Sequence, residues 1–153
     1  MSNNSRSLDE IDQTIIKVLQ SNSRATLVEI AKEVGELTEN AIRYRIDRLE
    51  KDDFISNYTI RLNPKKFGKN VIAIFNLNVL PENIKNTLEY LESIDSLTEI
   101  YLTTGDYSIV AIGLFNDNNE VTNFITEKLK KITMVNIEIT TVLKRVKHGF
   151  FEI

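Results

Sequence analysis

Residues 26–51 read TLVEIAKEVGELTENAIRYRIDRLEK, and the first half of the fold follows from this stretch. Its apolar residues recur at helical spacing as far as Gly35, which tolerates positive φ and is therefore a typical residue to end a helix. Thr38 comes next as the candidate N-cap of a second helix. That helix has one apolar stripe at i, i+4 and i+7, formed by Ile42, Ile46 and Leu49. Two short helices around a tight turn are typical of a helix-turn-helix.

The second helix presents a polar face of the kind that reads DNA. When its apolar stripe faces the core, the residues pointing outward are Asn40, Tyr44, Asp47, Arg48 and Lys51, with Arg43 on the shoulder. Arg and Asn side chains reach base edges in a major groove, and Arg and Lys bind phosphates. The alternative is an ordinary solvated amphipathic helix, and the helix and turn that precede it favour DNA binding. The candidate DNA-binding residues are Thr38, Asn40, Arg43, Tyr44, Arg45 and Arg48, of which Arg45 is expected to brace the helix or contact phosphate.

Composition excludes several kinds of protein. The chain has 153 residues, no Cys and a single His. The absence of Cys excludes disulfides and thiolate metal sites, and one His disfavours zinc sites and His-based catalysis, so we expect no metal and no cofactor. There is no apolar run long enough to span a membrane and no apolar signal core at the N-terminus. We therefore expect a cytoplasmic protein without a membrane partner.

The charge of the chain is acidic overall but basic in one place. The formal net charge of −3 argues against a protein that coats nucleic acid without specificity. Residues 43–48 (RYRIDR) nevertheless carry three Arg against one Asp. We expect affinity for double-stranded DNA to come from a few directed contacts, summed over several subunits.

The segments on either side of the helix-turn-helix predict a first helix and a wing. Ser7 and Glu10 have the spacing of a capping box, and an apolar stripe follows to about Asn22. After the recognition helix, residues 54–62 suggest two short strands around Ser56-Asn57, as in a winged helix-turn-helix. Pro64 and the lysines near it break this pattern. We therefore predict a DNA-binding domain at 1–60, a linker at 61–70 and a second domain at 71–153.

The second domain alternates strand and helix patterns. Strands are predicted at 71–80, 97–104, 107–115 and 135–146, with helices that begin at Pro81 and Asp117 and a hairpin turn at Gly105-Asp106. The order βαββαβ is that of a ferredoxin-like domain, so the fold class is α+β. Both helices lie on one face of such a sheet. The other face must also be covered, and dimerisation is a common way to cover it.

The two halves together resemble the Lrp/AsnC family, the feast/famine transcription regulators. The resemblance covers nearly the whole chain and is carried by residues 8–68 and by IYLTTGDYSIVAIG at 100–113. The positions that match the family pattern in the first half are Leu8, Asp9, Asp12, Leu19, Arg24, Ala31, Arg45, Ile46, Leu49 and Ile55.

This resemblance implies a homodimer that commonly assembles further into octamers, and a small effector that is usually an amino acid. The effector would bind at the contact between dimers, where the turn at 105–108 would supply much of the site and the last strand and the adjoining subunit would supply the rest. A Gly-containing turn offers backbone N–H groups to a carboxylate, and Asp106 is suited to hold an ammonium group. The candidate effector-binding residues are Thr103, Thr104, Gly105, Asp106, Tyr107, Ser108, Glu138, Thr140 and Thr141.

The chain departs from the family pattern around this turn. Ser108 stands where the family often has Asp, Thr133-Met134 replaces Pro-Gly, and Glu138 replaces a common Thr. Glu138 favours an effector with a donor side chain, such as glutamine or lysine.

Two other functions are compatible with the resemblance. Some proteins similar to this family decarboxylate siroheme-type tetrapyrroles with the help of histidines, but here the single His148 lies in the C-terminal tail. A low-specificity architectural DNA-binding protein is the second alternative, and the acidic net charge disfavours it. We expect a sequence-specific transcriptional regulator that is not an enzyme.

Overall fold

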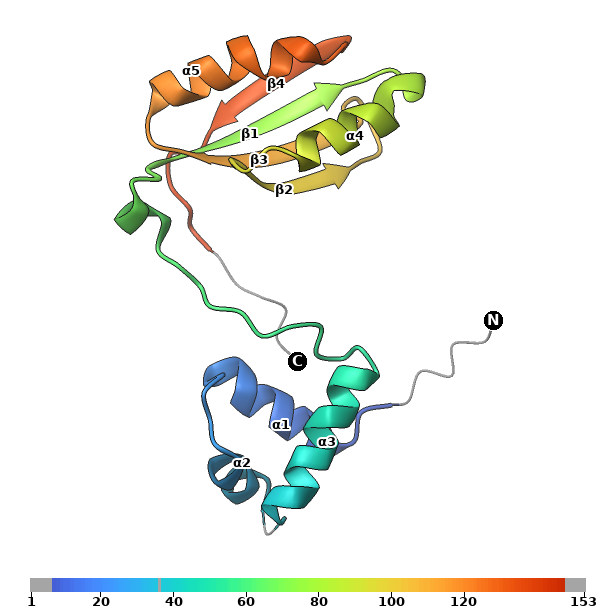
Figure 1. Cartoon of the computed structure of the whole chain (residues 1–153), viewed down its shortest axis with the longest axis vertical. Coiled ribbons are helices and arrows are strands. Elements are labelled where there is room, and N and C mark those ends of the chain that lie inside the picture. Colours follow the sequence, from blue (N-terminus) through green and yellow to red (C-terminus); the bar gives the residue numbers. More distant parts are fainter. Residues whose placement is uncertain (1–6, 36, 148–153) are drawn as a thin grey trace. The chain divides into compact units, whose positions relative to one another are not determined.

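A computed structural model describes residues 7–35 and 37–147, which form two compact units at 7–61 and 62–147 (Figure 1). Each unit has its own hydrophobic core and is described by itself. His148, which matters to the enzyme alternative, lies outside the described residues.

The first unit is a bundle of three helices, α1 (Glu10–Ser21), α2 (Leu27–Val34) and α3 (Glu39–Lys51). Its core has buried residues from every helix: Ile15, Ile30, Ile42 and Leu49. Gly35 ends α2 with a φ of 88°, and the Thr38 hydroxyl caps α3 by accepting the Ala41 N–H at 3.2 Å. Both predictions for the turn are therefore confirmed, because both depend on local backbone chemistry.

The predicted start of α1 is wrong. The helix begins at Glu10, and its N-cap is Asp9 rather than Ser7. The Asp9 carboxylate accepts the Asp12 N–H at 2.7 Å. It also accepts a hydrogen bond from Arg45 of α3, so a tertiary contact as well as the local one fixes Asp9 at the helix start.

The predicted wing is also wrong, because residues 52–70, all of which the structure describes, contain no strand. Instead, α3 ends in a Schellman motif: Asp53 adopts a φ of 61° and donates its N–H to Glu50, while the N–H of Phe54 bonds to Leu49. These bonds turn the chain back against the helix, and Ile55 packs on the core of the first unit. Phe54 and Ile55, which were predicted to begin the first strand of the wing, thus form the C-terminal cap of α3.

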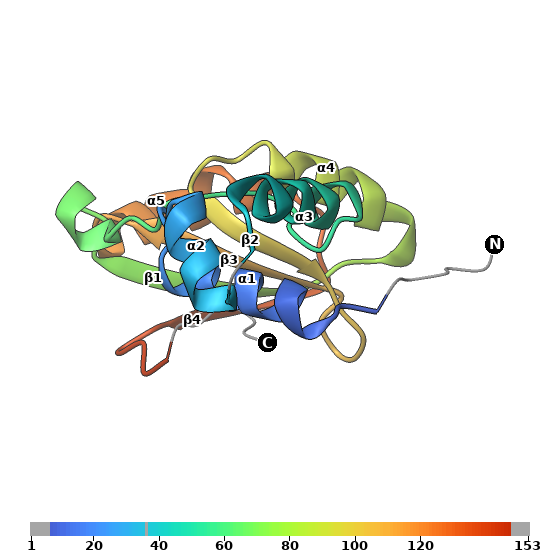
Figure 2. The same ribbon diagram turned by 90° about the horizontal axis from the view of Figure 1, so that it is seen from below.

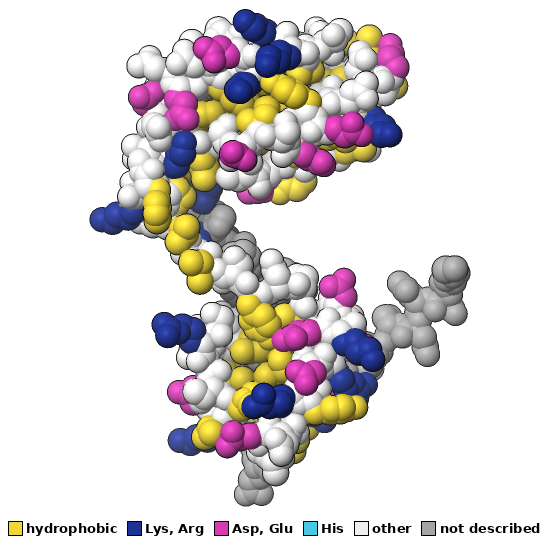
Figure 3. Space-filling model, in the orientation of Figure 1, with side chains coloured by type: hydrophobic (Ala, Val, Ile, Leu, Met, Phe, Trp, Pro, Cys, Tyr) yellow, Lys and Arg dark blue, Asp and Glu magenta, His cyan; other side chains and the backbone are white. Residues whose placement is uncertain are grey.

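The connecting segment is bound to the second unit along residues 63–70. A short 3₁₀ turn, η1 (Pro64–Phe67), is capped by the Asn63 side chain. Lys69 then forms an ion pair of 3.3 Å with Glu120, and Asn70 donates to the carbonyl of Asn116 at 3.3 Å. Hydrophobic side chains follow one another at the surface of this connection (Figure 3), and they include Ile60, Leu62 and Phe67.

The second unit is a four-stranded antiparallel sheet with two helices. Its elements are β1 (Val71–Asn78), α4 (Ile84–Glu92), β2 (Leu97–Leu102), β3 (Ile109–Phe115), α5 (Asn118–Glu127) and β4 (Asn136–Thr141). The strand order β2-β3-β1-β4 confirms the ferredoxin-like prediction. The last strand is shorter than the predicted 135–146 and ends at Thr141, which pairs with Ala73 near the start of β1. Beyond that point β4 has almost no partner strand left.

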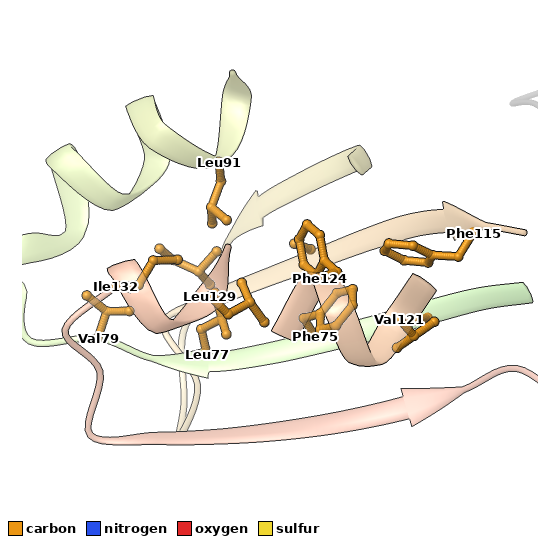
Figure 4. Close-up of a cluster of buried hydrophobic side chains, with 12 residues drawn as sticks. Phe75, Leu77, Val79, Leu91, Phe115, Val121, Phe124, Leu129 and Ile132 are labelled. Carbon is orange, nitrogen blue, oxygen red and sulfur yellow. The ribbon is translucent and has the colours of Figure 1, made fainter. Parts of the chain in front are cut away.

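Alternate residues of β1 face two different environments. Ala73, Phe75 and Leu77 are buried under α4 and α5, which lie on the same side of the sheet (Figures 1 and 2). The rings of Phe75, Phe115 and Phe124 meet there with centroids 5.0–5.9 Å apart (Figure 4). The opposite face carries no helix from the described part of the second unit and has a half-buried apolar stripe on its two central strands: Ile72, Ile74, Val110, Ile112 and Leu114.

Gly113 of β3 has no room for a side chain. A Cβ atom at this position would lie 2.6 Å from the Phe115 ring and 3.1 Å from the Ser96 carbonyl oxygen. We expect Gly113→Ala to lower the free energy of unfolding by about 2 kcal/mol, because the core must shift to accept the methyl group. The check is chemical denaturation of the purified protein.

A double-mutant cycle tests the cause. In a Phe115→Leu background the ring that clashes is absent, so the additional loss caused by Gly113→Ala should be smaller by at least about 0.5 kcal/mol. An equal loss in both backgrounds would show that contact with the Phe115 ring is not the reason.

Candidate DNA-binding and effector sites

Helix α3 separates a buried face from an exposed one, as its residue spacing predicts. Ile42 and Leu49 are fully buried, whereas Asn40, Arg43 and Tyr44 are exposed, with 62% of Tyr44 accessible. Capping by Thr38 fixes the start of this helix, so the positions of the exposed side chains are set by the turn before it. An exposed helical face of this kind has the shape that enters a major groove.

Two of the candidate DNA-binding side chains contact each other. The Arg48 guanidinium lies 5.7 Å from the centre of the Tyr44 ring, within the range of a cation–π contact. Arg48 is half-buried, while Tyr44 remains largely exposed. Stacking limits the rotamers of both side chains and holds a positive charge beside an aromatic surface.

Arg45 points in a different direction from Arg43 and braces the helix. Its Nη1 donates to Asp9 at 2.7 Å and to Asp12 at 2.8 Å, and the Asp12 side chain is fully buried. Hydrogen bonds to Asp9 and then to Asp12 raise the pKa of Arg45, so it stays charged. Of the two roles expected for Arg45, the structure shows the bracing one. The sequence did not predict that Asp9 and Asp12 would be the partners of Arg45.

We expect Arg45→Ala to destabilise the first unit by about 3 kcal/mol, because the buried Asp12 carboxylate would lose a cationic partner. Thermal or denaturant unfolding, followed by a signal from this unit, measures the loss. The matched control is Arg43→Ala on the same helix, which should change the stability by no more than about 0.5 kcal/mol because Arg43 is exposed. Similar values for the two variants would contradict the bracing role.

The turn between β2 and β3 is a six-residue loop, 103–108, that is closed at its base. The Thr103 N–H donates to the Ser108 carbonyl at 2.8 Å, and the Thr103 hydroxyl donates to the Tyr107 carbonyl at 2.7 Å. Gly105 at the tip has a φ of 109°. Within the described part of the chain, the N–H groups of residues 104–107 make no hydrogen bond. Consecutive unbonded N–H groups are a typical anion-binding arrangement.

Ser108 connects this loop to the end of β1. Its hydroxyl accepts the Val79 N–H at 3.0 Å and lies 3.3 Å from the carbonyl oxygens of Leu77 and Val79. The side chain that was predicted to line the effector site therefore has a structural hydrogen-bonding role within the chain. Through it, the position of the loop depends on where β1 ends.

The last strand contributes its predicted residues to two different faces. Glu138 and Thr140 pair with Asn76 and Ile74 and share the face without helices, whereas Thr141 pairs with Ala73 on the helix-covered face. A hydrogen bond to Glu138 raises the pKa of the Tyr107 hydroxyl. Tyr107 and Glu138 are therefore close enough to interact, whereas Thr141 belongs to the other face of the sheet.

Comparison with known proteins identifies both domains of the chain. Residues 8–50 match the AsnC-type helix-turn-helix domain, and residues 72–150 match the Lrp/AsnC ligand binding domain. The chain belongs to the Lrp/AsnC family. It is therefore a transcriptional regulator with a ligand-binding domain, as the resemblance predicted.

Two archaeal relatives are similar to this Lrp/AsnC protein along most of their length. The HTH-type transcriptional regulator Ptr1 of Methanocaldococcus jannaschii is 35% identical over 93% of this chain and 96% of its own. The HTH-type transcriptional regulator LrpA of Pyrococcus horikoshii is 35% identical over 82% of this chain and 88% of its own. Both are named as regulators and not as enzymes, in agreement with the non-enzymatic interpretation.

Solved structures show the same fold. Escherichia coli AsnC superposes with a TM-score of 0.90 at 25% identity, covering 96% of this chain and 99% of AsnC. A transcriptional regulator from Neisseria meningitidis in complex with L-Met has a TM-score of 0.86 at 23% identity, covering 93% of this chain and 94% of its own.

Over 7–35 and 37–147, no helix of this Lrp/AsnC protein is long and apolar enough to cross a membrane.

Proposed function

We propose that this chain binds a specific DNA site through α3 and that an amino acid bound to its second domain changes that binding. The observation that carries the DNA-binding part is the exposed face of α3, where Arg48 stacks on Tyr44 while Arg45 braces the helix from behind. A rigid helix with preset side chains loses little entropy when it binds, which favours specific contacts.

Within this proposal the polar residues of α3 divide into three roles. Asn40, Arg43 and Arg48 contact base edges, because amide and guanidinium groups pair with purines in the major groove. Tyr44 packs against the backbone or a base and keeps Arg48 in place. Thr38 and Arg45 position the helix through the cap and the Asp12 contact.

The same proposal includes a homodimer formed through the sheet face opposite α4 and α5. Its half-buried stripe includes Ile74 and Ile112, which pair with each other across β1 and β3. Apolar residues at the centre of an open face favour burial against another surface. A two-fold dimer would present two copies of α3 to a pseudo-palindromic site, and assembly to an octamer remains a prediction from the family resemblance.

The loop 103–108 and Glu138 support an amino-acid effector. The N–H groups at 104–107, unbonded within the described residues, suit a carboxylate, and Asp106 is exposed and available to an ammonium group. Glu138 lies beside Tyr107 and suits the donor side chain of glutamine or lysine. The effector would act by linkage, since a ligand that binds one arrangement of subunits better increases the population of that arrangement.

The DNA-binding proposal predicts a large effect from two arginines. Arg43→Ala combined with Arg48→Ala should weaken specific binding by at least about tenfold, because each contact with a base edge contributes about 1–3 kcal/mol. The matched control is Lys85→Ala with Lys128→Ala in the second unit, which removes the same charge from exposed positions. This control should retain most of the specific affinity.

A footprint of the DNA upstream of the protein's own gene, at fixed salt and with or without amino acids, is the measurement. Phased protection by the wild type that the arginine variant loses supports a specific regulator. Diffuse coverage would favour the architectural alternative. If the double arginine variant protects the DNA as well as the wild type does, α3 is not the reading element.

The effector proposal predicts that Glu138→Gln weakens binding of lysine or glutamine by about tenfold, because a charge-assisted hydrogen bond is lost. Titration calorimetry and the shift of the unfolding temperature measure this. Thr141→Ala is the control, since Thr141 belongs to the other face of the sheet. No heat and no stability shift with either amino acid on the wild-type protein would refute this choice of effector.

A further inference from the structure

A small polar cavity lies between α4 and the segment that leads into β4. It has a volume of about 150 Å³ and belongs entirely to the second unit. Among the described residues, no Asp or Glu lines it, whereas a Lys does. The side chains that matter here are Asn83, Asn86, Thr87, Lys131 and Thr133. None of them is among the residues of the loop 103–108.

The Thr87 hydroxyl is a buried polar group without a partner in the described part of the chain. Only 6% of Thr87 is exposed, and its side chain makes no hydrogen bond to any residue that the structure describes. Threonines elsewhere in the helices behave differently: Thr14, Thr122 and Thr126 each donate to the carbonyl four residues earlier. Because buried hydroxyls are nearly always hydrogen-bonded, we expect the Thr87 hydroxyl to bond to a polar group from outside the described residues, and the cavity that Thr87 lines is the nearest space for one.

The other polar groups around the cavity are also uncommitted. Asn83 precedes α4 without capping it. Neither Asn83 nor Asn86 bonds through its side chain within the described residues, and Lys131 forms no ion pair there. By contrast, Asn63 and Asn70 use their side chains in hydrogen bonds. One buried hydroxyl thus shares the lining of this space with two amides and one ammonium group, and Asn86 and Lys131 are exposed, so the space opens to solvent.

Charge and size restrict what can bind. A full positive charge with no described carboxylate lining the cavity favours an anion, and amide and hydroxyl donors suit carboxylate oxygens. An engineered cavity of about 150 Å³ in another protein holds benzene, so a ligand of about six heavy atoms fits. We propose that this cavity binds a small carboxylate, with Lys131 and the Thr87 hydroxyl as its main contacts.

The cavity and the proposed effector loop are at the same end of the sheet. Val79, just after β1, donates its N–H to Ser108 of the loop, and the chain then continues into α4. On the other side, Asn136 at the start of β4 pairs with Asn78 at the end of β1. The end of β1 positions the loop 103–108. A ligand held between α4 and residues 131–133 therefore contacts the segment that follows β1 and the segment that precedes β4.

The test is thermal unfolding of the full chain with increasing acetate or L-alanine at constant ionic strength. We expect a saturable rise in unfolding temperature with at least one of these ligands. Lys131→Gln should abolish the rise, and Thr87→Val should weaken the apparent affinity by about fivefold through loss of one hydrogen bond. The control Lys130→Gln removes the charge of an exposed neighbour that does not line the cavity, and it should behave like the wild type.

Two further measurements distinguish binding in this cavity from binding at the loop 103–108 and from a purely structural role of Thr87. Asp106→Asn removes the carboxylate proposed to hold an ammonium group at the loop, and it should leave the rise with L-alanine unchanged. Without ligand, Thr87→Val should unfold at the same temperature as the wild type or higher, since it removes an unbonded hydroxyl. No saturable rise with either carboxylate, a rise that persists in Lys131→Gln, or a lower unfolding temperature of Thr87→Val without ligand would each overturn the proposal.

Discussion

The buried carboxylate of Asp12 is the constraint on which the DNA-binding unit depends. A charge enclosed in a small three-helix core is tolerated only when a cation and several donors compensate for the lost water. Arg45 supplies the cation from the recognition helix, and Asp9 shares it at the start of α1. The same contact therefore stabilises the core and fixes the rotation of α3 about its axis. Since Arg45 is held inward, Arg43 and Tyr44 are directed outward by the helix geometry alone.

In the second unit the equivalent constraint is the central position of β1. Because β1 pairs with both β3 and β4, its register determines which residues of all three strands face the helices and which face the opposite side. Phe75 anchors the aromatic core under the helices, while Ile74 belongs to the opposite face. The loop, the end of β4 and the polar cavity near α4 are all positioned by contacts with the two ends of this strand. Core packing, the proposed dimer face and both proposed ligand sites thus depend on one register.

Local signals predicted the helix-turn-helix correctly, although the local capping-box spacing of Ser7 and Glu10 gave the wrong start for α1. Gly35 and Thr38 act within one helical turn, so the helix-turn-helix could be predicted from them. Asp53 was missed because a helix end of this type usually has Gly at that position, and without it the next residues resembled a strand. The length of β4 could not be predicted from its own composition. The strand ends where β1, its only neighbour among the described strands, has almost no further residues to pair with it.

The candidate site was predictable to a more limited extent. Thr140 and Thr141 were both assigned to the effector pocket, although neighbouring residues of a strand face opposite sides, so the period of two would have separated them. The contact between Tyr107 and Glu138 and the inward direction of Arg45 join elements far apart in sequence. Such contacts depend on the tertiary fold, and residue spacing does not contain them.

The short connection between the units has a geometric consequence. Tyr58 bonds to the first unit through Glu50, and Asn63 begins the turn that belongs to the second. Five Cα steps separate them, and an extended chain covers at most about 3.6 Å per step, so the connection spans no more than about 18 Å. The length of this connection therefore sets an upper limit on the distance between Tyr58 and Asn63. In the proposed homodimer, the separation of the two recognition helices, and with it the spacing of the DNA half-sites, would follow from the way in which the second domains assemble.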